Sequence, residues 1–172
     1  MRPELASAFL RHGRSDDARK VIKDSETASR EVTDIGERVP GLRKFAELLL
    51  TLEGDRYGSQ VAQFDDPVFR TVAAMVGAEE AMKHDRRDEA DRLTVLAIAA
   101  SQEPGTKPHT AYMLAWTLET AAAAGLTGLD PQLAQQASRL ARQMPAGDGR
   151  SVATRERKLI RFLSSSERSV VT

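Results

Sequence analysis

The sequence contains no cysteine, which excludes disulfide frameworks, thiolate metal sites and cysteine nucleophiles. This absence fits a reducing compartment, and we expect a cytoplasmic protein. The formal net charge at pH 7 is zero, because 25 lysines and arginines balance 25 aspartates and glutamates. The chain as a whole therefore offers no electrostatic reason to bind a nucleic acid or a membrane.

Long apolar segments are also missing. The longest apolar runs have about eight residues, whereas a membrane span needs about 20. The N-terminal residues 1–4 contain no apolar stretch of the kind found in secretory signals, so we expect no signal peptide. No stretch alternates apolar and polar residues over several positions, as a half-buried strand would. We therefore predict essentially no sheet.

Motifs that identify common enzyme classes are absent as well. The chain has no glycine-rich phosphate loop, Walker pattern or nucleophile elbow. Its histidines, His12, His84 and His109, fall at predicted helix ends or in a loop, where an imidazole satisfies free carbonyls. Glu80 and His84 are one helical turn apart, but helical metal sites need a second Glu-x-x-His motif and further carboxylates. We predict a non-catalytic protein without a metal or cofactor.

The sequence is rich in helical patterns. Apolar residues make up 41% of the chain, and most recur at spacings of three and four, as on one face of a helix. Residues 93–100 read LTVLAIAA, without a charge, inside a longer helical run. A helix that is apolar on nearly every side must be covered on nearly every side. We predict that this stretch is the central element of the fold.

Several residues predict helix ends. Pro3 suits the first turn of a helix that ends at Gly13, after which Ser15 is the expected cap of a second helix. Residues 32–39 suggest a short helix that Pro40 stops. Asp65-Asp66-Pro67 is the clearest start signal, and it predicts a helix from residue 67 to about residue 84.

We predict a single helical domain over residues 1–163. Residues 102–109 contain two prolines and a glycine, and we expect the best internal hinge there. Further helices are predicted at residues 110–124, 131–144 and 152–163. Residues 164–172 are expected to form a flexible C-terminal tail.

Two predicted helix junctions, residues 13–18 and 85–90, are alike. Each has a turn, then acidic residues, then an alanine, and the two are 72 residues apart. This pattern resembles the junction of tetratricopeptide repeats, which are helical pairs of about 34 residues. The residues that carry the resemblance are Leu5, Ala6, Phe9, Gly13, Ala18 and Ile22 in the first pair, and Ala78, Ala90 and Ala97 in the second.

The resemblance covers about a third of the chain, and three positions depart from the family pattern. Gly77, Ala81 and Thr94 stand where bulky residues are usual. Two all-α architectures therefore remain open. One is a tetratricopeptide-like α-solenoid of antiparallel hairpins, and the other is an irregular helical bundle.

The leading functional prediction is a protein–protein interaction or assembly module that recognises a partner through a helical groove or surface. Tyr112 and Trp116 lie one turn apart on a predicted helix, and such aromatic residues are enriched among interface anchors. Arg139 and Arg142 lie on the polar face of the predicted helix at residues 131–144. We predict these four side chains as partner-binding residues, with self-association as one form of the interaction.

The alternative prediction is a nucleic-acid-associated structural protein. Residues 149–172 carry a net charge of +4, and a basic amphipathic segment can bind phosphate backbones or an acidic partner helix. A helix that only caps the core would explain the same pattern. The predicted nucleic-acid-binding residues are Arg150, Arg155, Arg157, Lys158 and Arg161.

Overall fold

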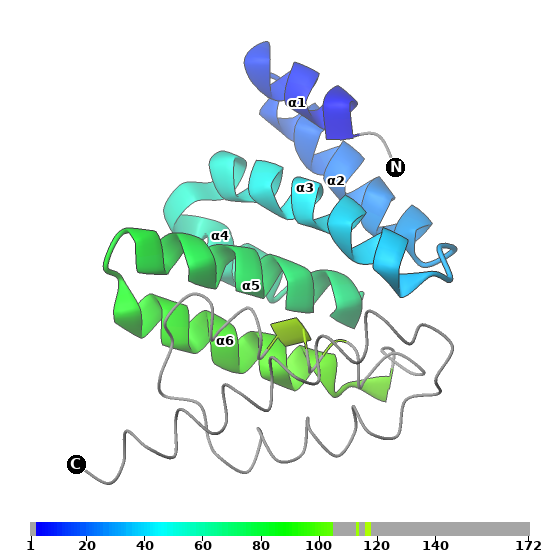
Figure 1. The fold of residues 1–172 in the computed structure, drawn as a ribbon. Helices are drawn as coiled ribbons and strands as arrows, with labels where there is room; N and C mark the ends of the chain where they lie inside the picture. Colours follow the sequence, from blue (N-terminus) through cyan, green and yellow to red (C-terminus); the bar gives the residue numbers. More distant parts are fainter. Residues whose placement is uncertain (1–2, 105–112, 114–115, 118–172) are drawn as a thin grey trace, which may run out of the picture.

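The computed structural model describes residues 3–104, 113 and 116–117. This part of the chain is mostly helical and contains no strand, which confirms the predicted all-α class. None of its helices is both long and apolar enough to cross a membrane. The helices are α1 (Pro3–Arg11), α2 (Ser15–Ser29), α3 (Ile35–Glu53), α4 (Tyr57–Val61), α5 (Pro67–Lys83) and α6 (Arg87–Ser101), with a short 3₁₀ helix, η1 (Gly54–Arg56), before α4 (Figure 1).

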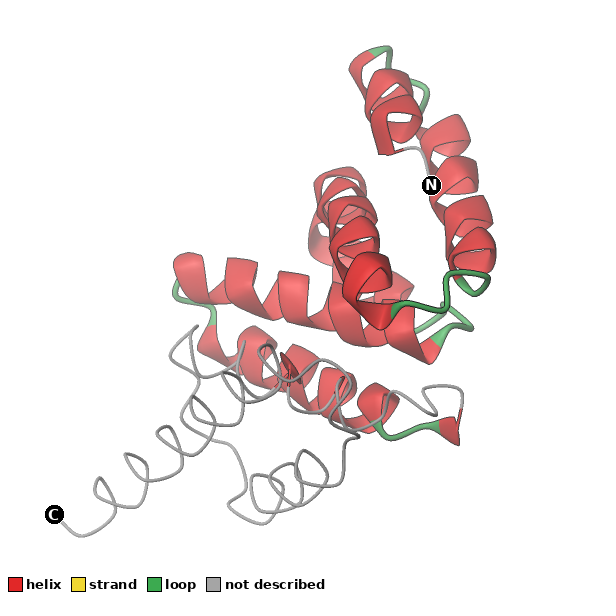
Figure 2. Cartoon of the chain, turned by 45° about the vertical axis from the view of Figure 1, so that its right-hand side comes forward, coloured by secondary structure: helices red, strands yellow, loops and turns green. Residues whose placement is uncertain are grey.

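The helices stack in the order in which they occur in the chain. The α1–α2 pair packs on α3, which in turn packs on α5, and α6 lies against α5. Figures 1 and 2 show these helices as successive layers. The tight turn between α5 and α6 makes them antiparallel neighbours, as the short connection predicts. The α1, α3 and α5 helices therefore form a continuous row, because α3 contacts both of the others.

The central helix of the described part is α5, not α6. Twelve of its 17 residues are buried, and it contacts α3, α4 and α6. Residues 93–100 are helical as predicted, but Val95 is 67% exposed and Ala99 is also exposed. Within the described residues, α5 rather than this stretch is the central element. Residues 71–78 are equally free of charge, and they belong to the helix that is covered by neighbours on several sides.

A glycine permits the close contact between α4, α5 and α6. A Cβ atom on Gly77 would lie 2.6 Å from Cε1 of Tyr57 and 2.9 Å from Cδ1 of Leu93. The Tyr57 hydroxyl is buried and donates a hydrogen bond to the carbonyl of Ala73 at 2.7 Å. Burial raises the pKa of this phenol, which remains neutral. Gly77 departs from the tetratricopeptide pattern because an aromatic ring from α4 fills the space of its missing side chain.

The predicted stop at Pro40 is wrong, because α3 continues through this residue to Glu53. The helix begins after Asp34, whose carboxylate accepts a hydrogen bond from the N–H of Gly36 at 2.7 Å. Pro40 is the sixth residue of α3 and is exposed. Its ring removes one backbone hydrogen bond near the start of the helix. The apolar stripe that follows outweighs that loss, because Leu42, Phe45 and Leu49 are buried.

The two similar junctions adopt the same backbone geometry. Gly13 and Asp85 both have left-handed conformations, with φ of 70° and 57°. The next residues, Arg14 and Arg86, have φ of −90° and −91°, and ψ is 66° in both. Arg14 occupies the cap position of α2 and makes no side-chain cap bond, so the prediction that Ser15 caps this helix is wrong. The backbone supplies the turn in both junctions, with N–H bonds of 2.9 and 2.8 Å from the two arginines back to the preceding helix.

The likeness extends along both hairpins. Helices α2 and α6 each have 15 residues and begin 72 residues apart. Ala18 and Ala90 are fully buried where each second helix meets the first. At the other end, the hydroxyls of Ser29 and Ser101 are buried and each donates to the carbonyl three residues earlier, both at 2.7 Å. The two hairpins thus share their junction and the length of their second helix, whereas α1 has nine residues and α5 has 17.

Candidate functional site

A groove runs between α1 and α3, which lie side by side in the row of helices. Residues spaced by three or four positions on each helix form its two walls, because such residues share a helix face. The groove has a volume of about 400 Å³. It is lined by Pro3, Glu4, Ser7 and Arg11 from α1 and by Lys44, Glu47, Leu48 and Thr51 from α3.

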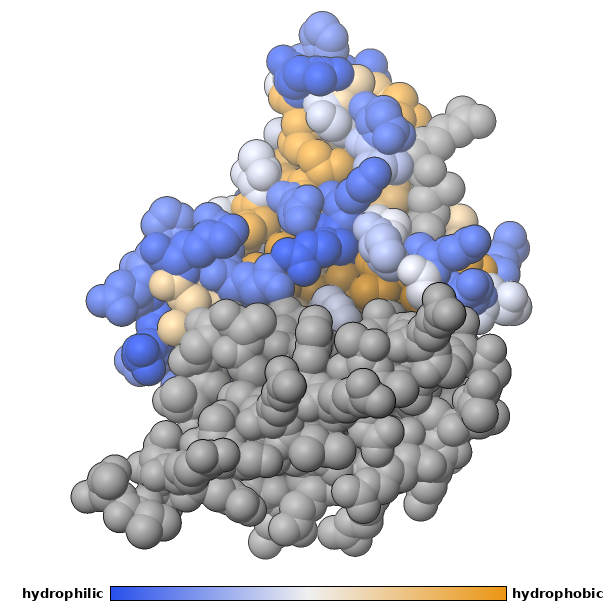
Figure 3. All heavy atoms as spheres, viewed as in Figure 1, coloured by the Kyte–Doolittle hydropathy of each residue, from blue (hydrophilic) through white to orange (hydrophobic). Residues whose placement is uncertain are grey.

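The groove has charges of both signs, and several of them have no ion-pair partner among the described residues. Glu4, Arg11 and Lys44 form no ion pair with any described residue. Leu48 adds a half-buried apolar side chain. Figure 3 shows apolar and hydrophilic residues side by side on one face of the described residues. The surface therefore combines apolar and charged side chains.

Arg43 joins the groove to α5. Its guanidinium lies 3.2 Å from the carboxylate of Glu47 and also donates to Glu79 on α5. The hydrogen bond to Glu79 is the main cause that raises the pKa of Arg43. Because Arg43 contacts both acids, it fixes the position of Glu47 in the groove wall relative to α5.

Glu80 and His84 are in contact, with 3.0 Å between the carboxylate oxygen and Nε2. A hydrogen bond from Lys83 and a second one from His84 lower the pKa of Glu80. Within residues 3–104 and the described residues beyond them, no three His, Asp or Glu side chains are placed to hold a metal ion. The contact is a hydrogen bond between side chains one turn apart on the surface of α5.

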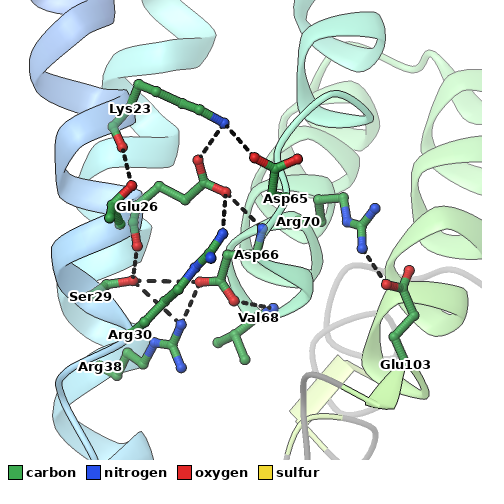
Figure 4. Close-up of polar contacts among 11 residues, drawn as sticks. Lys23, Glu26, Ser29, Arg30, Arg38, Asp65, Asp66, Val68, Arg70 and Glu103 are labelled. Carbon is green, nitrogen blue, oxygen red and sulfur yellow. Dashed lines mark hydrogen bonds and ion pairs between the residues drawn. The ribbon is translucent and has the colours of Figure 1, made fainter.

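A buried polar cluster joins α2, α3 and the start of α5 (Figure 4). The Asp66 carboxylate caps α5 by accepting the N–H of Val68 at 3.1 Å, and it also accepts a hydrogen bond from Arg38. Glu26 accepts the N–H of Asp66 at 2.7 Å. Ser29 lies within 3.5 Å of both Arg38 and Asp66. This cluster fixes the first hairpin relative to the central helix.

Half-exposed cations surround the cluster. Lys23 lies 2.8 Å from Glu26 and 3.3 Å from Asp65, and Arg30 lies 3.5 Å from Glu26. The hydrogen bond to Glu26 is the main cause that raises the pKa of Lys23. Because the two central carboxylates and Arg38 are buried, we assign this cluster a structural role rather than a ligand-binding role.

Neither the groove nor the polar cluster was among the sites predicted from the sequence. Arg38 and Asp66 are 28 residues apart, and Glu26 and Asp66 are 40 apart, so no local motif reveals their contact. The groove walls also could not be recognised from the sequence, because each is a short polar stripe on an ordinary amphipathic helix. Only the pairing of α1 with α3 brings the two stripes together.

The structure places one of the predicted partner-binding residues. Trp116 is partly buried and packs against the main core cluster, which also contains Met113. Its ring thus contributes to packing. The other predicted site residues lie outside the described residues, namely Tyr112, Arg139, Arg142, Arg150, Arg155, Arg157, Lys158 and Arg161. Most of the predicted hinge, residues 105–109, and the predicted tail lie outside them as well.

No protein-family model matches the sequence, and neither the curated proteins nor the solved structures include a match to this chain. The resemblance to tetratricopeptide repeats therefore stays a prediction. Support for a function comes from the groove, from the stacked helices and from the repeated hairpin.

Proposed function

We propose that this chain is a non-catalytic protein–protein interaction or assembly module that binds a segment of a partner in the groove between α1 and α3. The observation that carries the proposal is a groove with charged side chains that no described residue neutralises. A surface that has unpaired charges beside apolar atoms is suited to a polypeptide segment, because such segments offer both kinds of group.

The repeated hairpin supports a tetratricopeptide-like architecture. Ala6, Ala46 and Ala78 lie on α1, α3 and α5 and are all fully buried. Small residues at these positions let neighbouring helices approach closely. The row of helices built in this way leaves an extended side on which one polypeptide could contact several helices in turn. We therefore favour the solenoid over the irregular bundle.

Binding in this groove would be passive. The polar cluster holds the first hairpin, and Arg43 holds the α3 wall, so little ordering of the module would accompany binding. Arg11 and Lys44 would pair with acidic side chains of the partner, and Glu4 with a basic one. Such exposed charges contribute more to the association rate and to specificity than to affinity.

A pull-down from the native host tests this proposal. The groove variant combines Arg11→Glu with Lys44→Glu. The control variant combines Lys20→Glu with Arg87→Glu, which changes the net charge equally at exposed basic residues outside the groove. We expect the wild type and the control to retain the same partner protein and the groove variant to lose it. Equal recovery by all three, or no partner at all, would contradict the proposal.

The alternative function, nucleic-acid association through residues 150–168, is favoured by the charge distribution. Residues 3–104 contain fifteen lysines and arginines against twenty aspartates and glutamates, although the whole chain is neutral. The positive excess therefore lies in the rest of the chain. Salt-dependent binding of mixed RNA or DNA that disappears on truncation at Gly149 would support this function. Salt-independent or absent binding would exclude it.

A further inference from the structure

The outer face of α1 is an exposed surface with an unusual composition. Leu5 is 42% exposed, and it and Val95 are the two large apolar side chains that are exposed within the described residues. Ser7 and Ala8, which are small, occupy the middle of the helix. Glu4 and Arg11 lie near its two ends, and both are exposed.

The second copy of the hairpin shows what covers the corresponding position. Gly77 is the residue 72 positions after Leu5, and it is buried against the Tyr57 ring from α4 and against Leu93 from α6, the second helix of its own hairpin. In the repeated hairpin, therefore, this position of the first helix is a contact site for another helix. In α1 the same position has a leucine that remains exposed.

The charges on this face are self-complementary. Glu4 and Arg11 are seven residues apart, or about 10.5 Å along a helix axis, and two full turns place them on the same side. If a second α1 lies antiparallel to the first, each Glu4 faces the other Arg11, and the small residues meet at the two-fold axis. Neither side chain has an ion-pair partner among the described residues of its own chain.

We propose that a second copy of this chain docks on α1 through an antiparallel, two-fold-symmetric contact between the two α1 helices. This inference rests on the proposed function, of which it specifies the self-association form. Leu5 would pack beside the partner's helix, and the Glu4–Arg11 pairs would close both ends of the contact. The same patch is used by both copies, so the assembly closes as a dimer.

The contact is small, and the dimer is accordingly weak. A helix of nine residues is only about 13 Å long, and stable interfaces usually bury at least about 1,200 Å² in total. We therefore expect a dissociation constant of about 100 μM or weaker. Such a dimer forms at high concentration of the chain. A partner segment in the groove would compete with it, because Glu4 and Arg11 also line the groove.

Sedimentation equilibrium of the full chain over a wide concentration range tests the inference. The variants are Glu4→Arg, Arg11→Glu and the double variant with both, and Lys20→Glu serves as a control outside the α1 face. We expect each single reversal to weaken dimerisation at least about threefold and the control to leave it unchanged. The double variant restores dimerisation, because each reversed charge again faces an opposite one.

The double variant distinguishes loss of the proposed contact from loss of α1 helix stability as the cause of weaker dimerisation. Both reversals oppose the helix dipole, so the double variant has the least stable α1 and would dimerise worst if helix stability were the cause. An equimolar mixture of the two single variants should form the heterodimer more strongly than either variant forms its own dimer. A strict monomer at all concentrations, or a double variant that remains monomeric, would overturn the inference. If the chain is a strict monomer but the wild type still captures a partner that the groove variant loses, only this inference fails. The proposed function then remains valid.

Discussion

Asp65 and Asp66 are adjacent acids that the sequence presents as equal members of one helix-start signal, and the structure gives them different roles. The Asp66 carboxylate is buried, caps α5 and contacts Arg38. The side chain of Asp65 is 77% exposed and lies 3.3 Å from Lys23. A buried ion pair that loses one partner leaves an uncompensated charge, whereas an exposed pair is largely replaced by water.

Replacement of Asp66 by alanine should therefore be much more harmful than the same replacement of Asp65. We expect Asp66→Ala to lower the free energy of unfolding by about 3–5 kcal/mol, because Arg38 remains buried without its partner and α5 loses its cap. Asp65→Ala should cost less than about 1 kcal/mol. Urea denaturation followed by circular dichroism measures both values. Similar losses for the two variants would show that the buried cluster is not the contact that holds α5.

At the scale of elements, the two hairpins show that different residues can build one junction. Gly13 and Asp85 share a left-handed conformation, which glycine adopts without steric cost and aspartate adopts with some strain. The backbone bonds and the buried alanine are the same in both. The shared geometry therefore predicts which of the two junctions can be stabilised by a substitution.

Asp85→Gly should raise the free energy of unfolding by about 0.5 kcal/mol, and Gly13→Asp should lower it by a similar or larger amount. Thermal and urea unfolding of the full chain measure both changes. Asp88→Gly is the matched control, because Asp88 is helical and glycine lowers helix stability by up to about 1 kcal/mol. If Asp85→Gly lowered the free energy of unfolding as much as Asp88→Gly, the left-handed conformation of Asp85 would carry no strain.

Much of the fold could be predicted from local signals. Apolar spacing and the Asp66-Pro67 start predict the helical class and the bounds of α5, and the two like motifs at residues 13–18 and 85–90 do have the same backbone geometry. The continuation of α3 through Pro40 could not be predicted, because the burial of the later apolar stripe depends on tertiary contacts. The identity of the central helix was missed for the same reason, since residues 71–78 and 93–100 look alike until their neighbours are known.

The candidate site could not be predicted because both of its walls are unremarkable by themselves. Pro3, Ser7 and Arg11 form a polar stripe on an ordinary amphipathic helix, as do Lys44 and Thr51. In the whole molecule, the stacking of the helices places α1 beside α3, and only then do the two stripes form a groove. We propose that the groove presented by this stack binds a partner protein.

Site-specific photo-cross-linking in the native host shows whether a partner protein lies in the groove. A benzoylphenylalanine probe replaces Ser7 in the groove or, as a control, Ala28, which is exposed on α2 away from the groove. We expect a discrete adduct from position 7 with a protein other than a second copy of this chain, lost when Arg11→Glu and Lys44→Glu are added, and no such adduct from position 28. The same adducts from both positions, or none from position 7, would contradict it.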